Sequence, residues 1–164
     1  MVTRETFRES MAHLGAAVSV ITTAGPAGRC GFTASSVCSL TDQPPMLSAC
    51  LNRSSLQHQA FKANGVVCVN ILAARQEPLT AVFAGQKGCT MEQRFELAQW
   101  RSLKTGAPAL EGALVSFDCE IEQVFEIGTH SLFICRVIAL AMSGEDRGLV
   151  YFKRACHAIG GAAP

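Results

Sequence analysis

Two adjacent segments in the second half of the chain constrain the fold most strongly. Over residues 115–127, apolar side chains alternate with polar ones, and Gln123 is the only lapse in the alternation. A period of two indicates a β-strand with one solvated face. Gly128, Thr129 and His130 then turn the chain, and the following run, SLFICRVIALAM, has the composition of a long buried strand. We therefore expect two long strands joined by a turn.

The rest of the chain predicts short strands with tight connections. β-rich runs occupy residues 17–23, 30–40, 46–51, 66–72 and 149–152. Helices are expected at 3–15, 76–83 and 91–97, and another from Ser54 or Ser55 to Asn64-Gly65. The segment 42–45 (DQPP) is expected to stop strand pairing, because proline cannot donate to a ladder. Since strands dominate, the pattern predicts one mainly β domain over 1–164, a closed, antiparallel, Greek-key-like barrel with peripheral helices.

Composition narrows the class of partners. Charged residues make up only 16% of the chain and hydrophobic residues 49%, which predicts that a second subunit covers part of the surface. The net charge of +1 comes from scattered basic residues, so no nucleic-acid partner is expected. No apolar run approaches the roughly 18–20 residues of a membrane span, and no secretory signal is recognisable. The expected location is therefore the cytoplasm, without a membrane partner.

The eight cysteines do not have the spacing of a metal site. No two are closer than eight residues, and C-x-x-C is absent. Zinc sites usually combine closely spaced ligands, so we predict no metal and mostly buried, inert thiols. Cys89, in a glycine-rich stretch, is expected to be the most exposed.

Familiar nucleotide and hydrolase motifs are missing. Gly25, Gly28 and Gly31 are regularly spaced, but they join two predicted strands and do not open a helix. The chain has no Walker A sequence, no H-E-x-x-H and no G-x-S-x-G.

Two short polar patches indicate a phosphorylated, planar ligand such as a flavin. The first is Thr33-Ala34-Ser35-Ser36, which taken alone is better read as the wet face of an edge strand. The second is Asn52-Arg53-Ser54-Ser55, whose serines alone would be an ordinary helix cap. If neighbouring strands bring the patches together, the first allows close backbone approach. The second then offers helix-start N–H groups and the charge of Arg53 to a phosphate.

His130 leaves two interpretations open. It lies at a turn between the two strongest strands, where its side chain can reach into a barrel mouth. It can equally be a histidine whose ring is satisfied within the turn. Its spacing does not decide between these.

Several longer motifs together resemble one family. They are FTASSVCSLTDQPP, CLNRSS, VCVNIL, FAG, GAPALEGALVSFDCEI, VFEIGTH and GLVYFKRACH. In order and spacing the chain is similar to the short-chain flavin reductases of two-component monooxygenases, from Phe7 to His157. The resemblance implies an FMN-binding split barrel and a homodimer with flavin near the subunit interface. It also implies a partner monooxygenase that receives reduced flavin by diffusion.

The resemblance assigns roles to individual residues. Thr33, Ala34, Ser35, Ser36 and Val37 would line the isoalloxazine, mostly through the main chain. Cys50 and Asn52 would border the ring and ribityl chain, Ser54 and Ser55 would hold the phosphate, and Ala84 and Gly85 would lie against the flavin. His130, as the catalytic residue, and Tyr151 would meet the nicotinamide, with Lys153 and Arg154 as contacts to the pyridine dinucleotide. His58 stands where many relatives have threonine, so a partly ionised histidine would replace a hydroxyl at the phosphate.

The implied reaction is reduction of a flavin by NAD(P)H. The cofactors are FMN, with FAD as the alternative, and NADH, with NADPH as the alternative. Hydride would pass from nicotinamide C4 to flavin N5, so no general base is required. Two other functions stay open, a non-catalytic FMN carrier and a bound-flavin reductase that acts on another acceptor such as a corrinoid.

Overall fold

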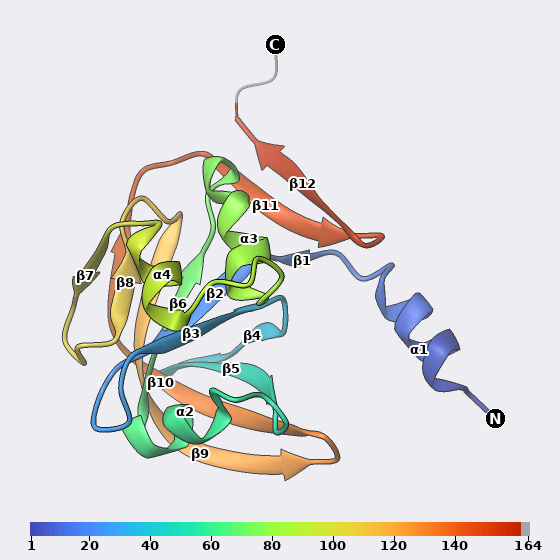
Figure 1. Ribbon diagram of the computed structural model, residues 1–164, viewed down its shortest axis with the longest axis horizontal. Helices are drawn as coiled ribbons and strands as arrows, with labels where there is room; N and C mark the ends of the chain where they lie inside the picture. Colours follow the sequence, from blue (N-terminus) through green and yellow to red (C-terminus); the bar gives the residue numbers. More distant parts are fainter. Residues whose placement is uncertain (162–164) are drawn as a thin grey trace.

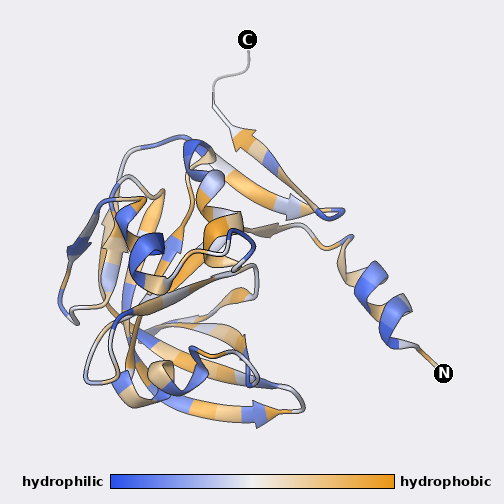
Figure 2. Cartoon of the chain, in the orientation of Figure 1, coloured by the Kyte–Doolittle hydropathy of each residue, from blue (hydrophilic) through white to orange (hydrophobic). Residues whose placement is uncertain are grey.

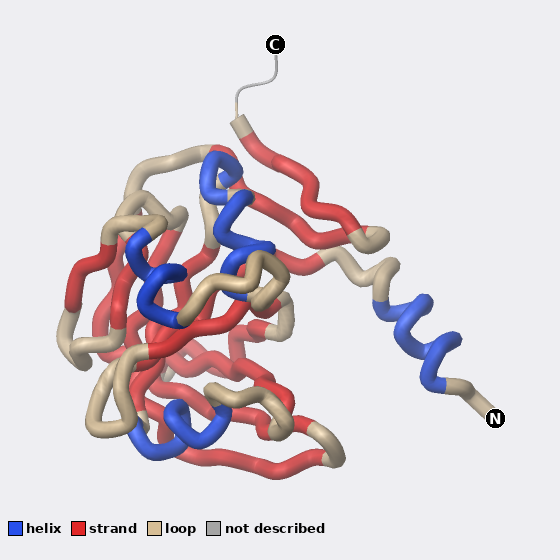
Figure 3. Tube along the Cα trace, in the orientation of Figure 1, coloured by secondary structure: helices blue, strands red, loops and turns tan. Residues whose placement is uncertain are grey.

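The computed structural model describes residues 1–161, and strands make up most of this part of the chain (Figure 3). The helices are α1 (Arg4–Met11), α2 (His58–Asn64), the 3₁₀ helix η1 (Ala74–Gln76), α3 (Pro78–Phe83) and α4 (Met91–Glu96). The strands are β1 (Ala16–Ala17), β2 (Ser19–Thr23), β3 (Cys30–Ala34), β4 (Val37–Asp42), β5 (Pro45–Asn52), β6 (Val66–Ile71), β7 (Trp100–Ser102), β8 (Pro108–Leu110), β9 (Val115–Ile127), β10 (His130–Met142), β11 (Arg147–Phe152) and β12 (Ala155–Gly160). The prediction of a mainly β fold with few helices is confirmed.

Seven strands form the main sheet in the order β3-β2-β6-β9-β10-β5-β4, and every pair is antiparallel. The long β9–β10 hairpin predicted from residues 115–142 lies at the centre of this order (Figure 1). The sheet curls into a barrel whose ladder ends at β3 on one side and β4 on the other. In the described chain no ladder joins these two strands, although only Ser35 and Ser36 separate them. The barrel is therefore split at this point.

The predicted single strand over 30–40 is in fact two strands with different partners. β3 pairs with β2, whereas β4 pairs with β5. The prediction that residues 42–45 stop pairing is also wrong, because Gln43 and Pro44 form the turn of the β4–β5 hairpin and Asp42 faces Pro45. Proline is tolerated as the first residue of a strand, and Pro45 occupies that position in β5.

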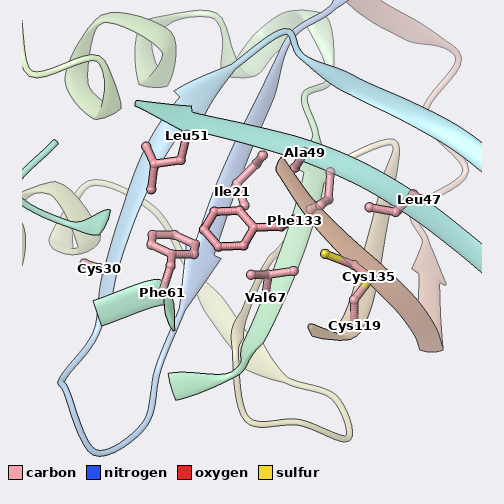
Figure 4. Close-up of a cluster of buried hydrophobic side chains, with 11 residues drawn as sticks. Ile21, Cys30, Leu47, Ala49, Leu51, Phe61, Val67, Cys119, Phe133 and Cys135 are labelled. Carbon is pink, nitrogen blue, oxygen red and sulfur yellow. The ribbon is translucent and has the colours of Figure 1, made fainter. Parts of the chain in front are cut away.

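The barrel interior is filled by aliphatic and aromatic side chains from both halves of the sheet. Ile21, Phe61, Val67 and Phe133 are essentially inaccessible to solvent (Figure 4). Phe61 comes from α2, so this helix closes one end of the core, and its ring lies 5.1 Å from the ring of Phe32. Hydrophobic residues concentrate on the strands (Figure 2), as the hydrophobic effect requires of a small barrel.

Three strands escaped the sequence analysis. β7 and β8 form a small hairpin in a region predicted to be irregular, and β12 pairs with β11 beyond the last predicted strand. β11 also pairs with β1, so the ends of the chain meet in a second, three-stranded sheet.

Helix α1 projects from the barrel and is shorter than the predicted 3–15 (Figure 1). None of its side chains is buried. Its contacts to the body include an ion pair from Arg154 Nη2 to Glu9 Oε2 at 2.7 Å and a hydrogen bond from the Lys153 N–H to the carbonyl oxygen of Ala12. The apolar face of this helix is therefore open in a single chain.

All eight cysteines are free thiols, and burial raises the pKa of the Cys30 thiol to about 11. Cys30, Cys68, Cys119 and Cys135 are buried, but the exposed thiol is Cys38 and not Cys89, which is only partly accessible. Cys38 lies on the edge strand β4, and this exposure could be recognised only once β4 was seen to be unpaired on one side. Over residues 1–161, no group of three or more metal-ligating side chains was found, and no helix has the length and hydropathy to cross a membrane.

Candidate functional site

The split between β3 and β4 opens into a cavity with a volume of about 640 Å³, which we call the main cavity. It is lined by Phe32, Thr33, Ala34, Ser36, Cys50, Leu51, Asn52, Ser55, Gln57, Phe83, Ala84, Gly85, Arg94 and His130. Ser36 follows β3 and Asn52 ends β5, and both residues line this cavity, so the two polar patches meet in one place. Nine of the predicted site residues are in this lining, and the volume falls in the range of small-molecule and cofactor sites.

Two of the hydroxyl groups of the first patch, those of Thr33 and Ser36, are engaged inside the protein. Thr33 Oγ1 donates to the carbonyl oxygen of Thr80 at 2.7 Å, and Ser36 Oγ donates to that of Cys50 at 3.3 Å. β3 pairs with β2 on one side only, so N–H and C=O groups on its other edge have no strand partner. This arrangement suits a ligand held by the main chain, as the resemblance implied.

Small residues leave room for a flat ligand against α3. Ala34 and Ala84 face the cavity, and Gly85 follows α3 with φ +78°, a left-handed conformation that favours glycine. A Cβ atom at Gly85 would lie 3.5 Å from Nη2 of Arg94. The donor groups, the small side chains and the size of the cavity therefore fit an isoalloxazine ring.

A second cavity of about 350 Å³ shares Thr33, Ala34 and Ala84 with the main cavity. Ser35, Tyr151 and Arg154 contribute to it, which agrees with the predicted nicotinamide side. A ligand in the second cavity would therefore lie next to one in the main cavity.

The two predicted basic contacts of the pyridine dinucleotide differ in position. Arg154 lines the second cavity but pairs with Glu9, and the hydrogen bond from Arg154 lowers the pKa of the Glu9 carboxyl. Lys153 is not brought into either cavity and lies over the ring of Phe152, 5.7 Å from its centroid. Both residues have positive φ and form the turn between β11 and β12.

The serine pair does not begin a helix, contrary to the prediction. Asn52 Oδ1 accepts hydrogen bonds from both the N–H and the hydroxyl of Ser54, each at 2.9 Å. Such local bonds from asparagine compete with helix formation, and α2 starts only at His58. The predicted set of helix-start N–H groups for a phosphate is therefore not formed.

Arg53, Ser54 and His58 line a larger outer groove of about 1180 Å³, which shares Asn52 and His130 with the main cavity. Nη2 of Arg53 lies 3.0 Å from Oε2 of Glu126. A hydrogen bond from Lys62 and the charge of Arg53 lower the pKa of the Glu126 carboxyl. Glu126 is therefore ionised near neutral pH and forms an ion pair with Arg53. Val37, predicted beside the ring, packs against the barrel core.

His58 is neutral, which corrects the expectation of a partly ionised side chain. It is only 2% exposed, and burial lowers the pKa of its imidazole. Nε2 lies 2.8 Å from the buried hydroxyl of Ser131, while Nδ1 has no protein partner. A charged ring at this position would lose hydration, and the attraction of Glu126 is opposed by the charges of Lys62 and Arg53.

The buried state of His58 predicts a pH-dependent stability. Because its pKa is lower in the folded than in the unfolded chain, the unfolded chain binds more protons as the pH falls below about 6.5, the ordinary pKa of histidine. The urea midpoint should therefore be lower at about pH 5.5 than at about pH 7.5, while carboxylates stay ionised. His58→Gln should flatten this dependence, and an unchanged slope in the variant would refute the assignment. His130→Gln, at an exposed histidine, is the matched control.

His130 stands at the mouth of the main cavity. It begins β10, opposite Asn52 in the β5–β10 ladder, and its Nδ1 lies 2.9 Å from the hydroxyl of Thr129. The side chain is exposed and lines both the main cavity and the outer groove. Both interpretations left open by the sequence agree with this geometry, because Nδ1 is bonded within the turn while the ring lines the main cavity.

Sequence reasoning missed several lining residues. Gln57 and Arg94 line the main cavity, and Thr80, Gln86 and Cys156 line the second one. Thr80, Gln86 and Arg94 belong to α3, α4 and their connection, Gln57 precedes α2, and Cys156 lies in β12. In none of these places does a motif distinguish a cavity-facing side chain from a solvated one. Burial raises the pKa of the Cys50 thiol, so this cavity residue stays protonated near neutral pH.

Comparison with known proteins agrees with this geometry. The model of the flavin reductase like domain matches residues 11–160. The chain belongs to the flavin reductase family. It is 52% identical over 160 residues to the FMN reductase (NADH) RutF of Ancylobacter novellus, covering 98% of this chain and 87% of that protein.

Solved flavin reductases share the fold. One is a protein of Haemophilus somnus 129PT assigned as a flavin reductase, with TM-score 0.92, 41% identity, and coverage of 96% of this chain and 100% of that one. Another is the styrene monooxygenase flavin reductase SMOB of Pseudomonas putida S12, with TM-score 0.81, 26% identity, and coverage of 96% and 98%. The split-barrel fold expected from the sequence is therefore confirmed.

Proposed function

We propose that this flavin reductase family member oxidises NADH and reduces FMN. The observation that carries the proposal is the meeting of two polar patches and the small residues Ala34, Ala84 and Gly85 in one cavity beside a second one. Relatives named FMN reductase (NADH), at about half identity over nearly the whole chain, support the choice of cofactors. FAD and NADPH remain the alternatives to be tested alongside them.

The residues supply binding and orientation and perform no acid–base chemistry. A bound flavin would supply the hydride acceptor and NADH the hydride donor, so the redox chemistry would belong to the cofactors. Residues 33–36 would hold the isoalloxazine through the main chain, and Ala84 and Gly85 would allow close approach. Tyr151 and His130 would keep the nicotinamide in contact with the ring, which lowers the barrier through proximity and orientation.

The decisive assay measures NADH oxidation with and without added flavin. Stimulation by free FMN, FAD or riboflavin supports a reductase that treats flavin as a substrate. Tight retention of FMN with negligible NADH oxidation would instead support an electron carrier. NADH oxidation that needs no added flavin but requires another acceptor, such as a corrinoid, would support the bound-flavin alternative.

Replacement of His130 by alanine should impair the use of NADH more than the binding of flavin. Its ring lines the mouth of the main cavity and is not buried in the core, so the fold should persist. We expect kcat/KM for NADH to fall by about tenfold, as for the loss of one positioning contact. Steady-state kinetics with varied NADH at saturating FMN measure this. Unchanged turnover together with an unchanged KM for NADH would show that His130 does not orient the nicotinamide.

We also propose a homodimer that supplies reduced flavin to a separate monooxygenase in the cytoplasm. Phe7 on α1 is 58% exposed, and Leu14, just beyond the end of α1, is 62% exposed. Met142 on β10 is 75% exposed. Apolar side chains this exposed suit burial against a second copy of the chain. The match to SMOB supports a partner oxygenase, and eight free thiols suit a reducing compartment. Sedimentation at micromolar concentration tests the dimer, and a compact monomer would refute it.

A further inference from the structure

We propose that Gln86 binds the carboxamide group of the nicotinamide in the second cavity and thereby fixes which edge of that ring faces the flavin. This inference rests on the proposed function and deepens it, because it names the residue that distinguishes a nicotinamide from other pyridine rings. Gln86 lies in the connection between α3 and α4 and lines the second cavity.

The end of α3 fixes the backbone position of Gln86. The Gly85 N–H donates to the carbonyl oxygen of Val82 at 3.1 Å, and the Gln86 N–H donates to that of Ala81 at 3.0 Å. Because Gly85 is in the left-handed conformation, at φ +78°, these two bonds form a Schellman motif, a common termination of a helix. Gln86 directly follows the left-handed residue, so its main chain is held in place while its side chain is exposed.

Gln86 carries the only side-chain amide in the lining of the second cavity, and within residues 1–161 this amide makes no hydrogen bond. The other polar side chains of the lining are hydroxyls, one thiol and one guanidinium: Thr33, Ser35, Thr80, Tyr151, Cys156 and Arg154. The hydroxyls of Thr33 and Thr80 already donate to carbonyl oxygens, each at 2.7 Å. Arg154 is paired with Glu9. Gln86 therefore offers the cavity an uncommitted donor and an uncommitted acceptor on one planar group.

A second amide is the natural complement of a carboxamide. The carboxamide of nicotinamide presents a C=O acceptor and an NH₂ donor, and a glutamine presents the same two groups, so two hydrogen bonds can form side by side. A hydroxyl has only one O–H to donate. A site that pairs both groups rejects a ring without the NH₂, because the glutamine oxygen then lacks its donor.

The position of Gln86 also suits the reactive edge of the ring. Thr33, Ala34 and Ala84 form the wall that the second cavity shares with the main cavity, and Gln86 is two residues beyond Ala84. The reactive carbon of a nicotinamide is C4, which has to face this wall for transfer to a flavin on the other side. The carboxamide is bonded to the neighbouring carbon, C3, so it has to lie near the same wall.

The test compares the binding of NAD⁺ and of 3-acetylpyridine adenine dinucleotide, in which a methyl group replaces the amide NH₂. Isothermal titration calorimetry in the presence of saturating FMN measures both Kd values without turnover, because neither dinucleotide donates hydride. The unmodified protein should bind the analogue less tightly than NAD⁺. In Gln86→Met, which keeps the length of the side chain without its amide, the ratio of the two Kd values should shrink by about two- to tenfold, the range of one hydrogen bond between neutral groups.

Two further variants give the sign and the control. Gln86→Glu should widen the ratio, because a carboxylate still accepts from the NH₂ of NAD⁺ but repels the acetyl oxygen of the analogue. Any repulsion between this carboxylate and the phosphates is common to both dinucleotides and cancels in the ratio. Gln123→Met is the matched control, since Gln123 is exposed on β9 and lines neither cavity, and it should leave the ratio unchanged.

An unchanged ratio in Gln86→Met, or a ratio that does not widen in Gln86→Glu, would overturn the assignment. So would the absence of NAD⁺ binding by the unmodified protein. Both variants should fold, because the side chain is exposed and the Schellman bonds belong to the main chain. Failure of the proposed reductase activity is distinguishable, because it appears as absent NADH oxidation in protein whose ratio of Kd values still depends on Gln86. NADH oxidation together with an unchanged ratio would contradict this inference alone.

Discussion

Replacing Ala84 by leucine should weaken FMN binding by about a hundredfold, because the larger side chain enters both cavities at their shared wall. Ala84 lines the main and the second cavity alike. Crowding a packed site with added methylenes costs typically about 1–3 kcal/mol, and every 1.4 kcal/mol is about tenfold in Kd. NADH oxidation in the presence of FMN should fall in parallel, since the leucine side chain would occupy space that both the isoalloxazine ring and the nicotinamide need.

The fold should tolerate this change, which makes the result interpretable. Ala84 is exposed and ends α3 with a right-handed helical backbone, so leucine is sterically allowed there. The unfolding midpoint should stay within the range typical of surface substitutions. Ala84→Ser is the matched control and should bind FMN almost normally, because serine adds little volume. FMN binding of Ala84→Leu equal to that of the unmodified protein would place the flavin somewhere else.

Replacing Asn70 by alanine should reduce the free energy of unfolding by about 3 kcal/mol, the cost of orphaning buried hydrogen-bonding groups. Asn70 is inaccessible to solvent within β6. Its Oδ1 accepts from the Leu110 N–H at 2.8 Å and from the Ser116 hydroxyl at 2.7 Å, and its Nδ2 donates to the carbonyl oxygen of Val20 at 3.0 Å. One side chain thus connects β2, β8 and β9 around the middle of the sheet.

Chemical denaturation at neutral pH measures this effect. Gln123→Ala is the control, because Gln123 is exposed on β9 and makes no side-chain hydrogen bond in the described structure; we expect less than about 0.5 kcal/mol. Flavin binding by folded Asn70→Ala should be retained, since Asn70 lines neither cavity. A loss below about 1 kcal/mol would show that water replaces the missing amide.

Most of the strands could be predicted from the sequence, but the strands with which they pair could not. Alternation at residues 115–127 and the apolar run after His130 predicted β9 and β10 almost to the residue, because side-chain periodicity is a local property. The break at Ser35-Ser36 was missed. Each half of the segment 30–40 is a good strand by composition, and only the curl of the sheet decides that β3 and β4 have different neighbours.

Some features of the candidate site were likewise recognisable in the sequence, and others only in the tertiary structure. Both polar patches were recognisable in the local sequence, and the tertiary structure brings Ser36 and Asn52 to one cavity. The predicted helix start at Ser54 is wrong, because Asn52 Oδ1 accepts hydrogen bonds from both the N–H and the hydroxyl of Ser54. Asn70 was visible as the one polar residue of an apolar strand, but the backbone groups that require it come from distant segments.

By itself, then, the sequence determined most of the strands, the family and the two polar patches, since these depend on short-range patterns. Tertiary structure alone decided where the barrel splits, that His58 is buried and neutral, and that Arg94 lines the main cavity. The physical reason is that pairing, burial and ion-pair competition depend on residues far apart in the chain, and periodicity does not encode them.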